Sequence, residues 1–248
     1  MLTHDGRAAA SRQAPTLGVL GGMGPAATAE FMRLLTAITP AQRDQDHPRV
    51  LVLSDTQIPD RRAAFGGGDD PTPWIRSDLF RLARWGADLL AMPCNTAHLF
   101  VEGMAAELPK PLVHIAEATI TQAYRRSPRG GLLVATGATV RSGLYQQWAR
   151  RLGYRLVVPP PDRQEAIDVM IDLVKAGQAE EAARSLAATL EEAWQERDLP
   201  MVAACTEVPL AYDLTGLPDD RMCSSLEALA EACLQRLNDA ACCESAVE

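Results

Sequence analysis

The sequence predicts an α/β fold of two similar parallel-sheet lobes, related by a pseudo-twofold axis, with the functional site in the cleft between them. Short apolar segments alternate with helix-like segments, which is typical of parallel sheets with crossover helices. Two of these apolar segments end in a cysteine with a threonine close behind, at Cys94 and at Cys205. Cys94 follows Val19 by about the same length of chain as Cys205 follows Leu133, so the arrangement looks duplicated. Ligands of parallel sheets bind at the carboxyl ends of strands, so both cysteines are expected to face one cleft.

The composition is that of an ordinary globular protein, with 47% apolar and 23% charged residues among 248. A net charge of −8 with scattered arginines argues against nucleic-acid binding. The chain shows no secretory segment and no apolar run of about 18 residues, which argues against a membrane partner and favours the cytoplasm. The six cysteines lack a C-x-x-C pair or zinc-ligand spacing, so free thiols and no metal are expected.

The first half of the chain is expected to form the first sheet. A buried strand at 16–20 leads into the glycine loop Gly21-Gly22-Met23-Gly24-Pro25, and Pro25 suits the first turn of a helix. The glycines would let the backbone approach a ligand. Further strands are expected at 49–54, immediately before Cys94 and at 112–115, and helices at 25–38, 72–86, 96–108 and 116–126.

A long loop, residues 55–71, follows the second expected strand and is called the lid here. It carries Arg61 and Arg62 and a glycine run at 66–68 that could act as a hinge. Its place at the carboxyl end of a strand predicts a segment that closes over a site. The alternative is a solvated surface connection.

The second half repeats the alternation. Strands are expected at 130–135, at 154–158 and immediately before Cys205. A loop containing Thr136, Gly137 and Thr139 follows the first of these strands. Helices are expected at 142–152, 163–176, 179–196 and 224–238. We therefore expect a first lobe at 16–115 with 207–240, a second lobe at 116–206, and disordered tails at 1–15 and 241–248.

Two thiols on opposite sides of a cleft suit a reaction that inverts a carbon bearing hydrogen. One group removes the proton from one face while the other supplies a proton to the opposite face. Cysteine fits both tasks because its ordinary pKa of about 8.5 can be tuned, and a thiolate is stabilised at a helix N-terminus. Cations for a substrate carboxylate are available at Arg61, Arg62 and Lys175. The alternative is that either cysteine is a small buried hydrophobe.

Five motifs occur in order over nearly the whole chain. They are Gly21-Gly22-Met23-Gly24-Pro25, Pro59-Asp60-Arg61, Met92-Pro93-Cys94-Asn95-Thr96-Ala97-His98, Val174-Lys175-Ala176-Gly177 and Cys205-Thr206-Glu207. Together they resemble the aspartate/glutamate racemase family, particularly its aspartate racemase branch. The resemblance implies a cofactor-independent enzyme with two α/β lobes, often a homodimer, that interconverts the enantiomers of an amino acid, here one with an acidic side chain.

The resemblance also implies roles for individual residues. Cys94 and Cys205 would form the acid–base pair. The α-carboxylate and ammonium groups would meet Asn95, Thr96 and Thr206, and the side-chain carboxylate would meet Arg61 and Lys175. The remaining expected substrate contacts are Met23, Gly24, Thr136, Gly137, Thr139 and Glu207.

Two positions depart from the family pattern. Ala204 stands where a glycine usually precedes the second cysteine, and Ile171 stands where a tyrosine often precedes the lysine by four residues. The second departure bears on the side-chain pocket and hence on the substrate.

Other functions remain open. One is an isomerase or decarboxylase with a single working cysteine, similar to maleate isomerase or arylmalonate decarboxylase. Another is an amino-acid sensor without turnover. His98 is expected to pack or cap rather than catalyse, and Glu207 either tunes Cys205 or favours a helix start.

Overall fold

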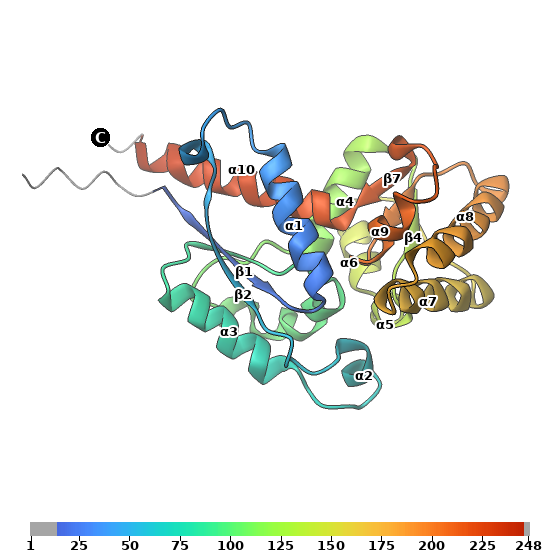
Figure 1. The fold of residues 1–248 in the computed structure, drawn as a ribbon, viewed down its shortest axis with the longest axis horizontal. Coiled ribbons are helices and arrows are strands. Elements are labelled where there is room, and N and C mark those ends of the chain that lie inside the picture. The colour runs from blue at the N-terminus through green and yellow to red at the C-terminus, as the bar shows by residue number, and fades with distance from the viewer. Residues whose placement is uncertain (1–13, 246–248) are drawn as a thin grey trace, which may run out of the picture.

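The structure is a computed structural model that describes residues 14–245. It has two lobes, each built on its own parallel sheet, as predicted. The chain passes from the first lobe to the second through α4 and returns through the long helix α10, which lies along the first lobe (Figure 1). Of the tails expected at 1–15 and 241–248, residues 1–13 and 246–248 lie outside the described residues. No helix within 14–245 combines the length and the apolar character needed to span a membrane.

The first sheet has the strand order β2-β1-β3, with all strands parallel. Every residue of the central strand β1 is buried, because helices cover both faces of the sheet. Leu17 and Val19 point to the face covered by α1 and α10, and Leu20 points to the face covered by α3. The elements are β1 (Thr16–Gly21), α1 (Pro25–Ile38), β2 (Arg49–Ser54), α2 (Arg61–Phe65), α3 (Thr72–Arg84) and β3 (Leu89–Ala91).

The second sheet has the order β5-β4-β6-β7, also parallel throughout. Val134 and Ala203 face α7, α8 and α9, and Leu133 and Val202 face α4 and α6. The elements are α4 (Ile115–Arg126), β4 (Gly131–Val134), α5 (Gly137–Ser142), α6 (Leu144–Arg151), β5 (Leu156–Val157), α7 (Pro161–Lys175), α8 (Ala179–Glu196), β6 (Met201–Ala203), α9 (Val208–Tyr212), β7 (Met222–Ser224) and α10 (Ser225–Ser245).

The duplication expected from the sequence is visible in the strand order. In each sheet the first strand of the lobe is central, the second lies on one side of it, and the third lies on the other. Cys94 follows the third strand of the first sheet, and Cys205 follows the corresponding strand of the second. The cysteine turns therefore occupy equivalent places in the two lobes.

The segment after Cys94 differs from the helix predicted for 96–108. It forms two 3-10 helices, η2 (Thr96–Phe100) and η3 (Glu102–Glu107). In an α-helix the Cys94 carbonyl would accept the backbone N–H of His98, but here it contacts the ring Nδ1 of His98 at 2.9 Å. The backbone N–H of His98 instead donates to Asn95, one residue closer, which tightens the turn.

The strand predicted at 112–115 is reduced to a single bridge between Leu90 and Leu112. Pro111 lacks a backbone N–H and so cannot extend the ladder. The helix predicted at 142–152 is found as α6, two residues late, because Gly143 before it has a left-handed φ of 76°. The segment after Thr136, which was expected to be a loop, forms the separate short helix α5. The strand predicted at 154–158 is reduced to two residues, Leu156 and Val157.

The boundary between the lobes also differs from the expected division. Residues 207–240 were expected in the first lobe, but β7 pairs with β6, which places residues 222–224 in the second sheet. α9 likewise packs on α7 and α8. Only α10 returns to the first lobe, and it continues to Ser245, so residues 241–245 of the expected tail are helical.

Candidate active site

Cys94 and Cys205 line one small cavity at the carboxyl ends of the strands, each contributed by a different lobe. The cavity has a volume of about 20 Å³, which is about the space that a single water requires. Each cysteine is less than a tenth exposed. Ten of the residues expected at the site line this cavity: Met23, Arg61, Cys94, Asn95, Thr96, Thr136, Lys175, Cys205, Thr206 and Glu207.

Three expected residues lie just behind this lining. A Cβ placed on Gly24 would be 3.8 Å from the carboxylate of Glu207, which is an ordinary contact distance and places Gly24 beside this residue. The backbone N–H of Gly137 donates to Asp168 at 2.9 Å. The hydroxyl of Thr139 is 3.1 Å from that of Thr96. These residues support the lining rather than form it.

Two further residues line the cavity: Asp60, which was not expected at the site, and Arg62, which the sequence offered only as an alternative cation to Arg61 and Lys175. Asp60 caps α2 by accepting the backbone N–H groups of Arg62 and Ala63. Burial raises the pKa of Asp60, but the N–H of Ala63 and the charges of Arg61 and Lys175 hold it below its ordinary value overall. Arg62 is the second arginine of the lid and contacts the second lobe. In the sequence, the position of Asp60 and Arg62 next to Arg61 indicated that they could reach the site. The directions of the two side chains follow from the fold.

The glycine loop after β1 lets the backbone turn sharply beside the cavity. Gly22 has φ of 89°, and a Cβ there would lie 2.4 Å from the backbone of Asp55, so a side chain cannot be accommodated. The hydroxyl of Thr28 accepts from the N–H of Gly22 at 3.0 Å and donates to the carbonyl of Gly24 at 3.1 Å. These two bonds to Thr28 hold the loop in place. Met23, which lies between the two bonded glycines, lines the cavity.

The surroundings of Cys94 partly favour a thiolate. Burial raises the pKa of this thiol above its ordinary value, and the charge of Glu207 adds to this effect. The positive charge of Arg61 and a hydrogen bond from the backbone N–H of Ala97 act in the opposite direction and limit the rise. The expected donor from the following helical turn is therefore present. Its source is a short 3-10 helix rather than a long α-helix.

The surroundings of Cys205 favour the protonated thiol. Its sulfur donates to the carboxylate of Glu207 at 3.0 Å, and the hydroxyl of Thr206 donates to the same oxygen at 3.1 Å. Burial and then the negative charge of Glu207 raise the pKa of Cys205 well above its ordinary value. Both pKa values are raised, but that of Cys205 is raised further, so Cys94 is the thiol of the pair that loses its proton more easily.

A cluster of buried hydroxyls joins the two lobes beside the cysteines. The hydroxyl of Thr96 in the first lobe is 3.3 Å from that of Thr136 and 3.1 Å from that of Thr139, both in the second lobe. Thr136 also caps α5 by accepting the N–H of Thr139. Thr96 and Thr136 therefore offer adjacent hydroxyls at the wall of the cavity.

Asn95 is held by partners from the second lobe and from α10. Its carbonyl oxygen accepts the hydroxyl of Tyr145, and its amide donates to Ser225 at 3.0 Å. Burial raises the pKa of Tyr145, so its hydroxyl remains a donor at neutral pH. These bonds fix the orientation of the amide where it meets the cavity.

Arg61 and Lys175 bring positive charge to the cavity from opposite lobes. Arg61 donates through Nη1 to the carbonyls of Ile58 and Pro59, both at 3.1 Å. Its Nε is buried and has no hydrogen-bond partner among the described residues. Lys175 ends α7. An anionic group in the cavity could use both charges, and it could satisfy the unpaired Nε.

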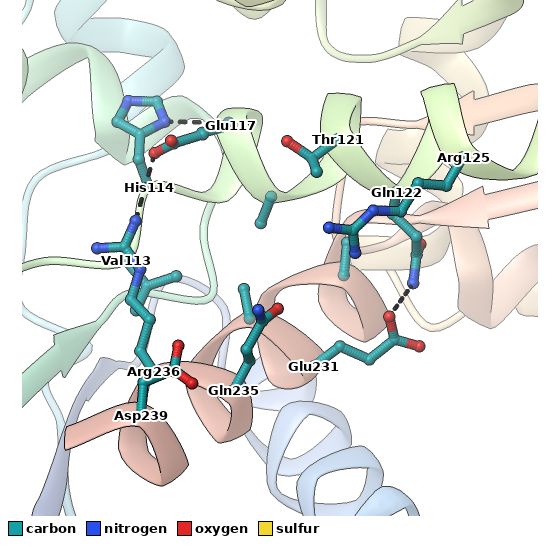
Figure 2. A pocket seen from close by; sticks show the side chains of 13 residues that line it. Val113, His114, Glu117, Thr121, Gln122, Arg125, Glu231, Gln235, Arg236 and Asp239 are labelled. Atoms are coloured by element: carbon teal, nitrogen blue, oxygen red, sulfur yellow. Dashed lines mark hydrogen bonds and ion pairs between the residues drawn. The ribbon is translucent and has the colours of Figure 1, made fainter. Parts of the chain in front are cut away.

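A second cavity of about 270 Å³ lies between α4 and α10, away from the cysteines (Figure 2). Its charged side chains are largely engaged with one another. Gln122 donates to Glu231 at 2.8 Å, and Arg236 lies 3.7 Å from Glu117. Among residues 14–245 there is also no group of three or more His, Cys, Asp or Glu side chains arranged to hold a metal ion. The two cysteines, Arg61 and Lys175 gather instead at the smaller cavity.

The chain is similar to known proteins over most of its length. Residues 20–233 match the model of the Asp/Glu/hydantoin racemase family. The broad specificity amino-acid racemase RacX of Bacillus subtilis is 28% identical over 202 residues, which cover 79% of this chain and 87% of RacX. The structure of Picrophilus torridus aspartate racemase aligns with a TM-score of 0.78 at 28% identity, covering 90% of this chain and 94% of that one.

A more distant likeness concerns the fold alone. Glutamate racemase from Thermus thermophilus aligns with a TM-score of 0.62 at 20% identity, covering 92% of this chain and 82% of that protein. The chain belongs to the Asp/Glu/hydantoin racemase family, and the enzyme class that follows is that of the amino-acid racemases, which are isomerases.

Proposed function

We propose that this enzyme racemises an amino acid with an acidic side chain, aspartate or glutamate, by proton transfer between Cα and the pair Cys94 and Cys205. The observation that carries the proposal is the meeting of the two cysteines, one from each lobe, at a single cavity. Their equivalent places in two duplicated lobes suit attack on opposite faces of one carbon.

The proton balance follows from this arrangement. The thiolate on one face takes the proton from Cα, and the bonding electrons remain on carbon, delocalised toward the α-carboxylate. The thiol on the other face gives its proton to Cα, so one thiol and one thiolate are present again with their positions exchanged. The thiols supply both transfers, so the reaction requires no cofactor. Thr96, Thr136 and Thr206 supply hydroxyls for the polar groups of the substrate.

When one thiol of the pair is deprotonated, the charge lies by preference on Cys94, because burial and Glu207 raise the pKa of Cys205 further. Arg61 and the N–H of Ala97 stabilise that thiolate, and Glu207 holds the proton on Cys205. The substrate enantiomer whose α-proton faces Cys94 reacts from this state. The opposite enantiomer reacts from the state in which Cys94 is protonated and Cys205 is the thiolate. This state forms after a turnover, or by proton exchange with solvent.

Arg61 and Lys175 are proposed to bind the side-chain carboxylate. The unpaired Nε of Arg61 supports this role, because a buried donor without a partner gains most from an incoming anion. Ile171 is fully buried and offers no hydroxyl to this part of the site. The preference for an acidic side chain therefore rests on the two cations.

The test measures racemisation of aspartate, glutamate and alanine by chiral chromatography, in the wild type and in Arg61→Ala. We expect loss of the arginine to cost roughly 2–5 kcal/mol of transition-state stabilisation for the acidic substrate, as for a broken buried charge contact. The cost should be much smaller for alanine. Equal losses for the two kinds of substrate, or a wild type that prefers alanine, would contradict the assignment.

A cytoplasmic location and a homodimer complete the proposal. The four cysteines whose side chains the structure describes, at 94, 205, 223 and 233, are free thiols, as expected in a reducing compartment. The homodimer rests on the resemblance to a family whose members are often dimeric. Light scattering coupled to size-exclusion chromatography measures it directly.

A further inference from the structure

The two neighbouring arginines of the lid make different contacts. Arg62 reaches out of the first lobe and pairs with Asp172 on α7 of the second lobe through both of its terminal nitrogens. It also lies 3.8 Å from Asp168, one turn earlier on the same helix. Arg61, by contrast, bonds only to carbonyls of its own loop and leaves Nε unpaired beside the cavity.

A second contact joins the same part of the lid to the second lobe. The guanidinium of Arg141, on α5, lies 5.7 Å from the centre of the Phe65 ring at the end of α2. Cation–π contacts at this distance are attractive. The short helix α2 therefore touches two helices of the second lobe, and Figure 1 shows it extending from the first lobe toward α5 and α7.

The contact of Arg62 continues into the wall of the active site. Asp168 accepts the backbone N–H of Gly137 at 2.9 Å, directly beside Thr136, whose side chain lines the cavity. The lid is thus joined through α7 to the loop that presents Thr136. With a cavity volume of only about 20 Å³, an amino acid cannot enter without some opening of these walls.

We propose that Arg62 is a positioning residue that docks the lid on the second lobe through Asp172 and Asp168, which leaves Arg61 free to bind the substrate. Opening breaks the contacts of Arg62 and Phe65, and the left-handed Gly67 at the glycine run has open space in which to move. The structural part of this proposal stands on the contacts alone, and its consequence for turnover rests on the proposed function.

The exposure of the ion pair between Arg62 and Asp172 determines how strongly it stabilises the docked lid. The side chains of Arg62 and Asp172 are 30% and 59% exposed, and ion pairs of this kind contribute little free energy. Docking is therefore easily reversed, as substrate entry and product release require. Loss of the pair should shift the balance between open and closed lid by about two- to fivefold.

Hydrogen–deuterium exchange of the backbone, followed by mass spectrometry, tests docking without reference to catalysis. In Arg62→Gln and in Asp172→Asn we expect faster exchange within residues 61–68. Arg76→Gln is the matched control, because Arg76 also pairs with an exposed carboxylate, Glu107 at 3.3 Å, but within the first lobe. Arg62→Asp alone should also speed hydrogen exchange in the lid. The exchanged pair, in which Arg62→Asp is combined with Asp172→Arg, should restore slow hydrogen exchange because the ion pair is formed again with its charges reversed.

Kinetics test the consequence for turnover. Arg62→Gln should raise KM about two- to fivefold for acidic and neutral amino acids alike, whereas Arg61→Ala should discriminate between them. The exchanged pair should recover most of the KM effect. A KM effect confined to acidic substrates would show that Arg62 reads the side chain and would overturn its separation from Arg61.

The two parts can fail separately. Unchanged lid exchange in Arg62→Gln relative to Arg76→Gln, or no recovery in the exchanged pair, would overturn the docking role even in an active racemase. Faster lid exchange that the exchanged pair reverses, in a protein that racemises no amino acid, would support docking while contradicting the proposed function.

Discussion

Cys94 and Cys205 occupy equivalent turns, but a different charge lies beside each of them. Burial raises the pKa of both thiols. Glu207 adds to this effect at both thiols and accepts a hydrogen bond from Cys205 alone, whereas Arg61 and the N–H of Ala97 oppose it at Cys94. A sequence that is nearly symmetric in its cysteine turns therefore yields an asymmetric pair, because the residues that follow each cysteine differ.

Glu207 provides a test of this asymmetry. Glu207→Gln removes the negative charge and the charged acceptor beside Cys205, so the raised pKa of this thiol should fall. Because the acid must be protonated to act, the alkaline limb of the profile of kcat/KM against pH should move to lower pH. We expect kcat/KM to fall by about ten- to a hundredfold, since a hydrogen bond to a charged group contributes about 1.5–3 kcal/mol.

The matched control is Glu207→Asp, which retains the charge and should keep the limb closer to its wild-type position. An unchanged alkaline limb in Glu207→Gln would mean that the carboxylate does not hold the proton on Cys205. The profile is measured from initial rates with either enantiomer.

At the scale of residues, the sequence predicted which side chains gather at one cavity better than it predicted their contacts. The repeated strand-cysteine turn identifies Cys94 and Cys205, and the family motifs add Arg61 and Lys175. The contact between the sulfur of Cys205 and Glu207 depends on how the turn after β6 bends back on itself. The residues adjacent to Cys205 in the sequence do not indicate how this turn bends.

At the scale of elements, His98 joins the turn after β3 to the beginning of α4. Its ring is fully buried, with Nδ1 contacting the Cys94 carbonyl and Nε2 accepting the backbone N–H of Ile115 at 3.3 Å. Nδ1 must therefore carry the proton. Burial lowers the pKa of His98 from 6.5 to about 4, so the ring is neutral near neutral pH and does not serve as a charged acid.

The lowered pKa predicts how stability depends on pH. The unfolded chain binds a proton to His98 below about 6.5, and the folded protein does so only below about 4. The free energy of unfolding should therefore fall as pH decreases through this window, by up to about 3 kcal/mol for His98 alone.

Denaturant unfolding followed across this window measures the effect. In His98→Asn the amide can still donate to the Cys94 carbonyl but does not titrate, so the slope with pH should be smaller. A slope equal to that of the wild type would contradict a buried neutral His98. The comparison uses the difference in slope, because His114, whose pKa burial lowers to about 2, contributes in the same direction in both proteins.

Elements with strong periodicity were predicted well, and short ones poorly. The helices at 163–176 and 179–196 are found within two residues of their expected bounds. The β7 strand was not predicted because its three residues directly precede a helix and carry no alternation of their own. After Cys94, the ring of His98 contacts the Cys94 carbonyl in place of the backbone N–H that an α-helix would supply. Helix propensities do not include such a side-chain contact.

At the scale of the whole molecule, the duplication was predictable but the boundary between lobes was not. Strand pairing depends on contacts between residues that are distant in the sequence. The residues near Met222 do not indicate that β7 will extend the second sheet. The return of α10 to the first lobe, which packs it against α1, connects the lobes a second time. The two cysteine turns therefore meet across a cleft that the chain crosses twice.

Racemisation in heavy water tests the central claim, that Cys94 and Cys205 act on opposite faces of one carbon. Starting from one enantiomer of aspartate or glutamate, chiral separation and mass spectrometry follow deuterium at Cα in product and in remaining substrate. Two bases predict a product deuterated from the first turnovers and a substrate that remains protiated early in the reaction. Cys94→Ser and Cys205→Ser should each lower racemisation by several orders of magnitude, and Cys233→Ala, far from the site, should be nearly normal. A product that retains the substrate's own proton, or near wild-type racemisation by Cys205→Ser, would contradict the two-cysteine mechanism and favour a single working cysteine.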